Sequence, residues 1–182
     1  MIYRKSPIIS EDFTGLSGLY CYVTPKHSPE LVEIQASLLS LQHESFVEVT
    51  PLDDYHCTIM YSKESEHEVL DVNKFVEGFT KKTEFTVAFK RFDMWQGHND
   101  DYYFGIIWSG DTLRNLHYRL KNEFHCQSSF DEYLCHTTIA TVKYDEAAHL
   151  EKIKIFNNIL IAAQKPQRVV FTNLTIANCR QD

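Results

Sequence analysis

Several features are scarce or absent in this 182-residue chain. It has no apolar run of about 18 residues, so we expect no membrane-spanning helix and no membrane partner. The amino-terminal segment, MIYRKSPIISEDF, contains no apolar stretch of the kind that directs secretion. Low-complexity segments and long linkers are also missing. We therefore expect one domain, residues 1–182, with two lobes.

Positive charge is scarce as well: the chain has 18 Lys and Arg against 25 Asp and Glu, which gives a net charge of -7. Long nucleic acid is bound by neutralising many phosphates, so we predict no long nucleic-acid partner. A small anionic ligand in a local pocket remains compatible with this charge. The five cysteines are odd in number and lack framework spacing, which indicates reduced thiols and a cytoplasmic location. Nothing in the composition fixes an oligomeric state.

Hydrophobic periodicity predicts alternating strands and helices. The expected strands are 18–24, 55–61, 84–95, 102–108, 133–142 and 168–176, and 96–101 (QGHNDD) reads as a hairpin loop. The expected helices are 29–42 and those that begin near 71, 111 and 146. Each half of the chain thus repeats strands, helix, strand. We predict an α+β fold with two lobes, each a small antiparallel sheet with helices on its outer face, around a central cleft.

One four-residue pattern occurs twice, once in each half and both times in a predicted strand. The two copies are His56-Cys57-Thr58-Ile59 and His136-Thr137-Thr138-Ile139. Residues i and i+2 of a strand point to the same face, so each strand presents one imidazole beside one hydroxyl. Cys57 and Cys135, which flank the histidines, are expected to be small buried thiols rather than nucleophiles.

Two imidazoles and two hydroxyls facing one ligand suit phosphodiester chemistry that needs no metal and no cofactor. One neutral histidine takes a proton from the attacking hydroxyl, and the other, protonated, gives one to the leaving oxygen. The threonine hydroxyls of Thr58 and Thr138 can donate to phosphate oxygens as charge builds up in the transition state. The sequence leaves open which of His56 and His136 is the base. No metal site is predicted, because His117, His125 and Cys126 match no ligand spacing.

These motifs resemble the 2H phosphoesterase superfamily, which has the LigT-like fold. The flanking segments GLYCYV (18–23), DYHCTIMYS (54–62), YLCHTTIATV (133–142) and NLTIAN (173–178) are most similar to the bacteriophage anti-CBASS cyclic-oligonucleotide phosphodiesterases. The resemblance implies a metal-independent hydrolase that opens the cyclic di- and trinucleotides of bacterial antiphage signalling, in the host cytoplasm if the chain is phage-encoded. Such an enzyme would serve phage immune evasion.

The resemblance also implies residue roles. His56 and His136 match the family's catalytic histidines, and Thr58 and Thr138 match its phosphate-holding threonines. Tyr20 matches a tyrosine that lines the base pocket. The last strand departs from the family, because Ile176 stands where an aromatic base-stacking residue is expected.

Trp95 and Trp108 stand at the two ends of the predicted 95–108 hairpin and are substrate-binding candidates, since bases stack on such rings. Packing in the core is the other interpretation for both. Two other functions stay open. One is an RNA-end 2',3'-cyclic or 2',5'-oligonucleotide phosphodiesterase, which would use the same four residues. The other is a module that sequesters nucleotides without cleaving them, which the two intact histidine and threonine pairs disfavour.

Overall fold

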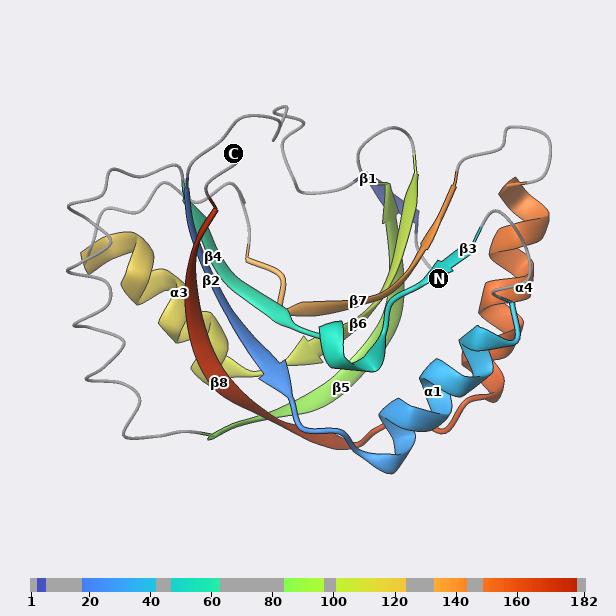
Figure 1. The fold of residues 1–182 in the computed structure, drawn as a ribbon, viewed down its shortest axis with the longest axis horizontal. Coiled ribbons are helices and arrows are strands. Elements are labelled where there is room, and N and C mark those ends of the chain that lie inside the picture. Colours follow the sequence, from blue (N-terminus) through green and yellow to red (C-terminus); the bar gives the residue numbers. More distant parts are fainter. Residues whose placement is uncertain are drawn as a thin grey trace.

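The strands form one curled sheet, and helices cover its outer side (Figure 1). The computed structural model describes residues 3–5, 18–41, 47–62, 84–96, 101–123, 133–143 and 149–179. The strands are β1 (Tyr3–Lys5), β2 (Gly18–Pro25), β3 (Val47–Val49), β4 (Cys57–Ser62), β5 (Glu84–Gln96), β6 (Tyr102–Ser109), β7 (His136–Val142) and β8 (Arg168–Cys179). The helices are α1 (Pro29–Leu39), the single-turn η1 (Leu52–Asp54), α3 (Asp111–Glu123) and α4 (His149–Ala162). The predicted α+β class is confirmed.

The strand order is β3-β7-β6-β5-β8-β2-β4, with all these neighbours antiparallel. The short β1 pairs in parallel with the end of β5. The two lobes, for each of which the sequence predicted a small antiparallel sheet, share one continuous sheet. The long strands β5 and β8 cause this: β5 pairs with β8 over 84–88 and with β6 over 88–96, so it belongs to both halves.

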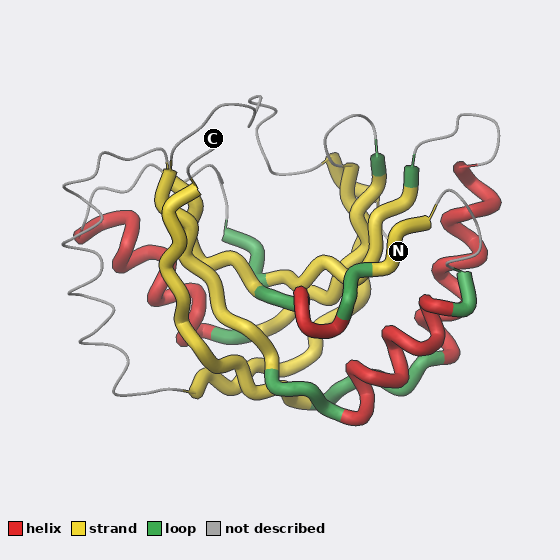
Figure 2. The backbone as a smooth tube through the Cα atoms, in the orientation of Figure 1, coloured by secondary structure: helices red, strands yellow, loops and turns green. Residues whose placement is uncertain are grey.

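Helices cover the outer side of the curl, with α3 against one arm and α1 and α4 against the other (Figure 2). The start of α1 follows the predicted capping pattern, since Pro29 is its first residue and the Ser28 hydroxyl accepts the Leu31 amide at 3.3 Å. The core lies between helices and sheet. Phe104 of β6, for example, stacks on Phe156 of α4 with ring centroids 4.3 Å apart.

The short elements β1, β3 and η1 were not expected, because three residues are too few to display a period. Helix α1 ends at Leu39 rather than at 42, and β8 runs three residues beyond its predicted end. The helix expected from residue 71 and most of the 96–101 loop lie outside the described residues. Within the described part of the chain, no helix has the length and apolar character needed to span a bilayer.

Candidate active site

The two strands that carry the repeated motif meet although they are not neighbours in the sheet. Cys57 of β4 and Cys135, the residue before β7, place their sulfur atoms 3.3 Å apart. Both side chains are buried and neither forms a disulfide, as the sequence predicted. The hydrogen bond with Cys57, together with burial, raises the pKa of the Cys135 thiol, which disfavours a nucleophilic role. Because each cysteine is adjacent to a motif histidine in the sequence, this contact also brings His56 and His136 close to each other.

Burial alternates along both motif strands as the period of two requires. Cys57 and Ile59 are fully buried on the helix side, whereas His56 and Thr58 are half-buried. On β7 the same alternation holds, with Thr137 and Ile139 buried while His136 and Thr138 are half-buried. The histidine and threonine of each motif therefore face away from the helices, on the inner side of the curled sheet.

Both imidazoles are oriented by the same contact. Nδ1 of His56 lies 2.8 Å from the carbonyl oxygen of Asp54, and Nδ1 of His136 lies 2.8 Å from that of Leu134. A carbonyl only accepts, so each Nδ1 carries the hydrogen and donates it. This fixes the tautomer of each neutral ring and assigns proton exchange with a ligand to Nε2. The chain therefore repeats the orientation of the ring as well as its sequence.

The two imidazoles are also linked electrostatically. Burial holds the pKa of His136 below its ordinary value, and the nearby positive charge of His56 lowers that pKa further. The hydrogen bond to the Leu134 carbonyl opposes these effects only in part. The lowered pKa favours the neutral form of His136, which is the state a general base requires.

An aromatic ring packs edge-on against each histidine. Tyr22 of β2 lies 5.7 Å from His56 between ring centroids, and Trp95 of β5 lies 4.8 Å from His136. Both pairs are T-shaped, so each imidazole is held in its plane by a ring from another strand. Sequence reasoning named Trp95 but did not name Tyr22 as a site residue. The signal was present, because alternation from Tyr20 puts Tyr22 on the same face.

Trp95 reaches His136 across a glycine. In the sheet, β6 separates β5 from β7, and Gly105 of β6 pairs with Thr138 of β7. A Cβ atom on Gly105 would overlap the Trp95 ring and would lie 2.7 Å from the Thr137 carbonyl oxygen. Only a residue without a side chain leaves room there, which gives Gly105 a positioning role that sequence analysis did not anticipate.

The structure places the predicted substrate-binding residue Trp108 in the core. Trp108 is 3 % exposed, its indole N–H donates to the Thr137 hydroxyl at 2.9 Å, and its ring packs edge-on against Phe171. This is the packing of a core residue on the helix side of the sheet. The backbone of Tyr20 pairs with Tyr61 on β4, and that of Ile176 pairs with Cys21 on β2. The side chains of Tyr20 and Ile176 lie outside the described part of the structure.

His117 of α3 serves packing rather than metal binding. Its Nδ1 donates to the Ile59 carbonyl at 2.7 Å, and its ring stacks on Tyr133 with centroids 4.4 Å apart. One buried side chain thus connects α3 to β4 and to the segment that leads into β7. His125 and Cys126 lie outside the described residues. Within the described ranges, no group of three or more potential metal-ligating side chains occurs.

We predict that His117→Phe keeps the stacking on Tyr133 but leaves the Ile59 carbonyl unpaired. A buried polar group without a partner costs about 1–3 kcal/mol, so the free energy of unfolding should fall by that amount. Urea denaturation followed by circular dichroism measures the change. His27→Phe is the matched control, because His27 is exposed and its loss should have little effect. Equal stabilities for the two variants would contradict the anchoring role of His117.

The curled α+β sheet presents one His-x-Thr strand from each half of the chain. Comparison with solved structures finds this fold in Usb1 of Kluyveromyces marxianus, with a TM-score of 0.60 over 91% of this chain and 95% of that chain. A second structure of that protein, with uridine monophosphate, gives a TM-score of 0.55 over 85% of this chain and 86% of that one. Sequence identities are 8% and 9%, so the likeness is one of fold. No family model and no curated protein matches the chain.

Proposed function

We propose that this protein is a phosphodiesterase that cleaves nucleotide phosphodiesters by acid–base catalysis from His56 and His136, without a metal ion. The observation that carries the proposal is the meeting of the two motif strands. It places two identically oriented imidazoles close enough for the charge of one to lower the pKa of the other. Thr58 and Thr138, on the same face, are assigned to the non-bridging oxygens of the phosphate.

The proposed step is attack of a ribose 2'-hydroxyl on the adjacent phosphorus. Nε2 of neutral His136 takes the proton of that hydroxyl while the new O–P bond forms. The 5'-oxygen leaves with the electrons of the broken P–O bond, and protonated His56 supplies its proton. The products are a 2',3'-cyclic phosphate end and a free 5'-hydroxyl. Hydrolysis of the cyclic phosphate then uses the two histidines in exchanged roles.

The assignment of His136 as base predicts a particular pH dependence. A base works when deprotonated, so on the acid side kcat/KM should fall as the pH drops below the lowered pKa of His136. The acid limb should therefore have its midpoint below 6.5, the ordinary value for histidine. In an NMR titration of His56→Gln, the pKa of His136 should rise, because the neighbouring positive charge is gone. An unchanged His136 titration would contradict the coupling between the two rings.

An RNA end is the substrate class that we propose first. Usb1 of Kluyveromyces marxianus, which shares the fold, has been solved with uridine monophosphate, a ribonucleotide. The net charge of -7 disfavours binding along an extended stretch of nucleic acid and is compatible with contact to only one or two nucleotides. The second candidate, a cyclic di- or trinucleotide, is favoured by the GLY, YS and AN residues that flank the strands and resemble the phage enzymes. Both substrates present the same 2'-hydroxyl and phosphodiester.

A substrate panel tests these proposals. The protein is incubated in EDTA with short RNA, RNA ending in a 2',3'-cyclic phosphate, 2',5'-linked oligonucleotides, and cyclic di- and trinucleotides. Products are then separated by chromatography. Cleavage at RNA ends supports the first candidate, and cleavage of the cyclic oligonucleotides alone supports the second. Retention of every ligand without products, or activity that EDTA abolishes, would overturn the phosphodiesterase mechanism proposed here.

A further inference from the structure

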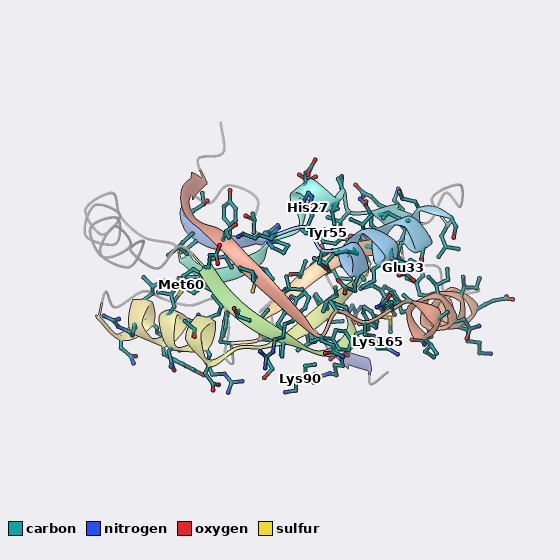
Figure 3. All side chains as sticks on the ribbon, turned by 90° about the horizontal axis from the view of Figure 1, so that it is seen from below. His27, Glu33, Tyr55, Met60, Lys90 and Lys165 are labelled. Carbon is teal, nitrogen blue, oxygen red and sulfur yellow. The ribbon has the colours of Figure 1, made fainter. Side chains whose placement is uncertain are left out.

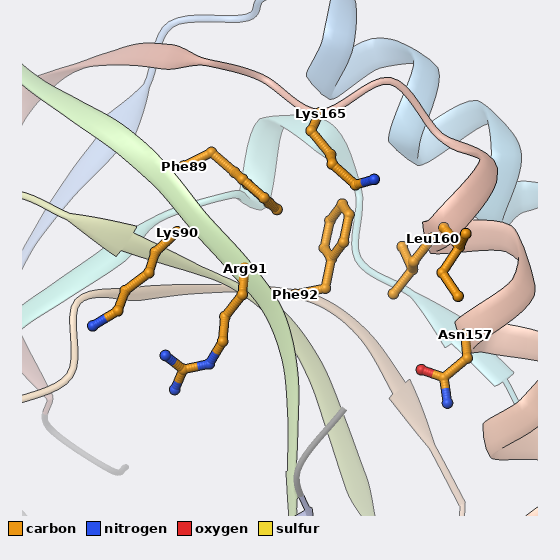
Figure 4. Close-up of a pocket in the computed structure, with 8 residues that line it drawn as sticks. Phe89, Lys90, Arg91, Phe92, Asn157, Leu160 and Lys165 are labelled. Carbon is orange, nitrogen blue, oxygen red and sulfur yellow. The ribbon is translucent and has the colours of Figure 1, made fainter.

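A cavity lies on the side of the sheet that faces α4. It has a volume of about 370 Å³ and is lined by β5, α4 and the segment that leads into β8. Its lining residues are Phe89, Lys90, Arg91, Phe92, Asn157, Leu160, Ile161 and Lys165 (Figure 4). Alternation along β5 points Phe92 to the face opposite that of Trp95, the residue that contacts His136. The cavity is therefore separate from the candidate active site.

A β-bulge creates the aromatic wall of this cavity. The pairing of β5 with β6 shifts register between Phe89 and Arg91, so Lys90 is an extra residue in the strand. Without the bulge, Phe89 and Phe92 would point to opposite faces. With it, both point toward α4, and their rings contact edge to face with centroids 5.0 Å apart. Both rings are only half-buried, so they offer an aromatic surface to a ligand.

The opposite wall comes from α4 and is unusually apolar for a surface helix. Ile161 is 70% exposed, the largest exposure among the described large hydrophobic residues, although it lines the cavity. Leu160 beside it is buried, and the Asn157 side chain adds an amide that can both donate and accept hydrogen bonds. A planar ligand between the phenylalanines and Ile161 would cover this exposed apolar surface.

The charge around the cavity is positive within an acidic protein. Three of its eight lining residues are cationic and none is acidic. The guanidinium of Arg91 is held by Asp93 at 2.8 and 2.9 Å, so it is already neutralised. Lys165 and Lys90 are exposed, and in the described part of the chain neither forms an ion pair. Lys165 extends over the same space as Phe92 in Figure 4, whereas Lys90 extends from β5 in the opposite direction.

We propose that this cavity is a binding site for a nucleotide, distinct from the active site. The base would lie against Phe89 and Phe92, since stacking on aromatic rings tolerates every base. The Asn157 amide would meet the polar edge of the base, and the Lys165 ammonium would pair with the phosphate. The cavity volume is at the lower end of the range for small-molecule sites, which suits a single nucleotide. In Figure 3, Tyr55, next to His56, lies in the upper part of the view, whereas Lys90 lies at its lower edge.

Methyl NMR of the full-length protein tests this site directly. Adenosine monophosphate, adenosine, inorganic phosphate and a deoxytetranucleotide, which lacks the 2'-hydroxyl needed for cleavage, are titrated separately. We expect the monophosphate to shift the methyl signals of Leu160 and Ile161, with half-saturation at a ligand concentration of about 1 mM. Adenosine and phosphate alone should each bind about tenfold more weakly, because each lacks one of the two contacts. If the deoxytetranucleotide binds as tightly as the monophosphate or more tightly, the natural ligand is a nucleotide within a strand. If it binds more weakly, the natural ligand is a free nucleotide.

Charge reversal supplies the matched comparison. Lys165→Glu should weaken binding at these methyl groups by about tenfold or more, since it replaces attraction of the phosphate with repulsion. Lys154→Glu makes the same change on an exposed part of α4 outside the cavity and should leave binding unchanged. Both variants should keep wild-type phosphodiesterase activity on a short substrate. Methyl signals that do not respond to the monophosphate, or that respond equally in both variants, would overturn the assignment of the site.

Discussion

Alanine in place of either motif histidine is expected to lower kcat by about 10²–10⁴-fold, the contribution of one general acid or base. His56 and His136 are half-buried and face away from the core, so either variant should keep the wild-type midpoint of thermal unfolding. The double variant should lose little more than the worse single variant, because the two groups act in one step. Single-turnover kinetics on the preferred substrate, together with thermal unfolding, measures both quantities.

His27→Ala is the control for that result. His27 is also an accessible histidine with a carboxylate nearby, since its Nε2 lies 3.4 Å from Asp53. It belongs to neither motif strand and should be dispensable for turnover. If kcat fell equally in the His27 variant, or stayed at the wild-type level in the His136 variant, the assignment of the site would be wrong.

The second large effect is expected at Gly105, which contacts no ligand in the proposed mechanism. A methyl group there collides with the Trp95 ring and with the Thr137 carbonyl oxygen 2.7 Å away. Relieving the collision moves the ring that packs against His136 at 4.8 Å, or the backbone that carries this histidine. Gly105→Ala should therefore lower the free energy of unfolding by about 1–3 kcal/mol. It should also lower kcat by about 10²-fold, because the base is displaced from its working position.

Gly110→Ala separates the two consequences. Its Cβ would lie 2.8 Å from a methyl carbon of Val87, so this variant also crowds a buried side chain. No motif residue touches that position among the described contacts, so stability should fall while kcat stays unchanged. The positioning role of Gly105 is falsified if the two variants show the same ratio of kcat loss to stability loss. Chemical denaturation and steady-state kinetics on both proteins provide the comparison.

Local signals in the sequence predicted the local structure well. The alternation of GLYCYV gave β2, and the Ser28-Pro29 pair marked the start of α1. The spacing of Leu113, Leu116 and Leu120 gave the buried face of α3. These features depend on residues within one or two turns of each other, which is the range over which periodicity carries information.

Non-local features escaped prediction. The continuity of the sheet depends on β5 pairing with β8, whose residues are about eighty positions away in the chain. The support of His136 by Trp95 requires a gap on an intervening strand, and no pattern in β6 marks Gly105 for that purpose. The bulge at Lys90 reverses which side chains face α4, so strict alternation would place Phe92 on the wrong face. In each repeated motif, by contrast, the shared orientation of histidine and threonine could be predicted, because it depends on only three residues of one strand.

The sharing of β5 and β8 between the two arms has a mechanical consequence. Each strand from β7 through β6, β5, β8 and β2 to β4 is hydrogen-bonded to the next, so the strands that carry the motifs of His56 and His136 belong to one sheet. Within this sheet, the spacing between the two imidazoles can change only by bending the hydrogen-bonded strands. In the proposed mechanism, a phosphodiester therefore reacts only if it fits this spacing. A substrate with a different backbone curvature would have to change its own conformation.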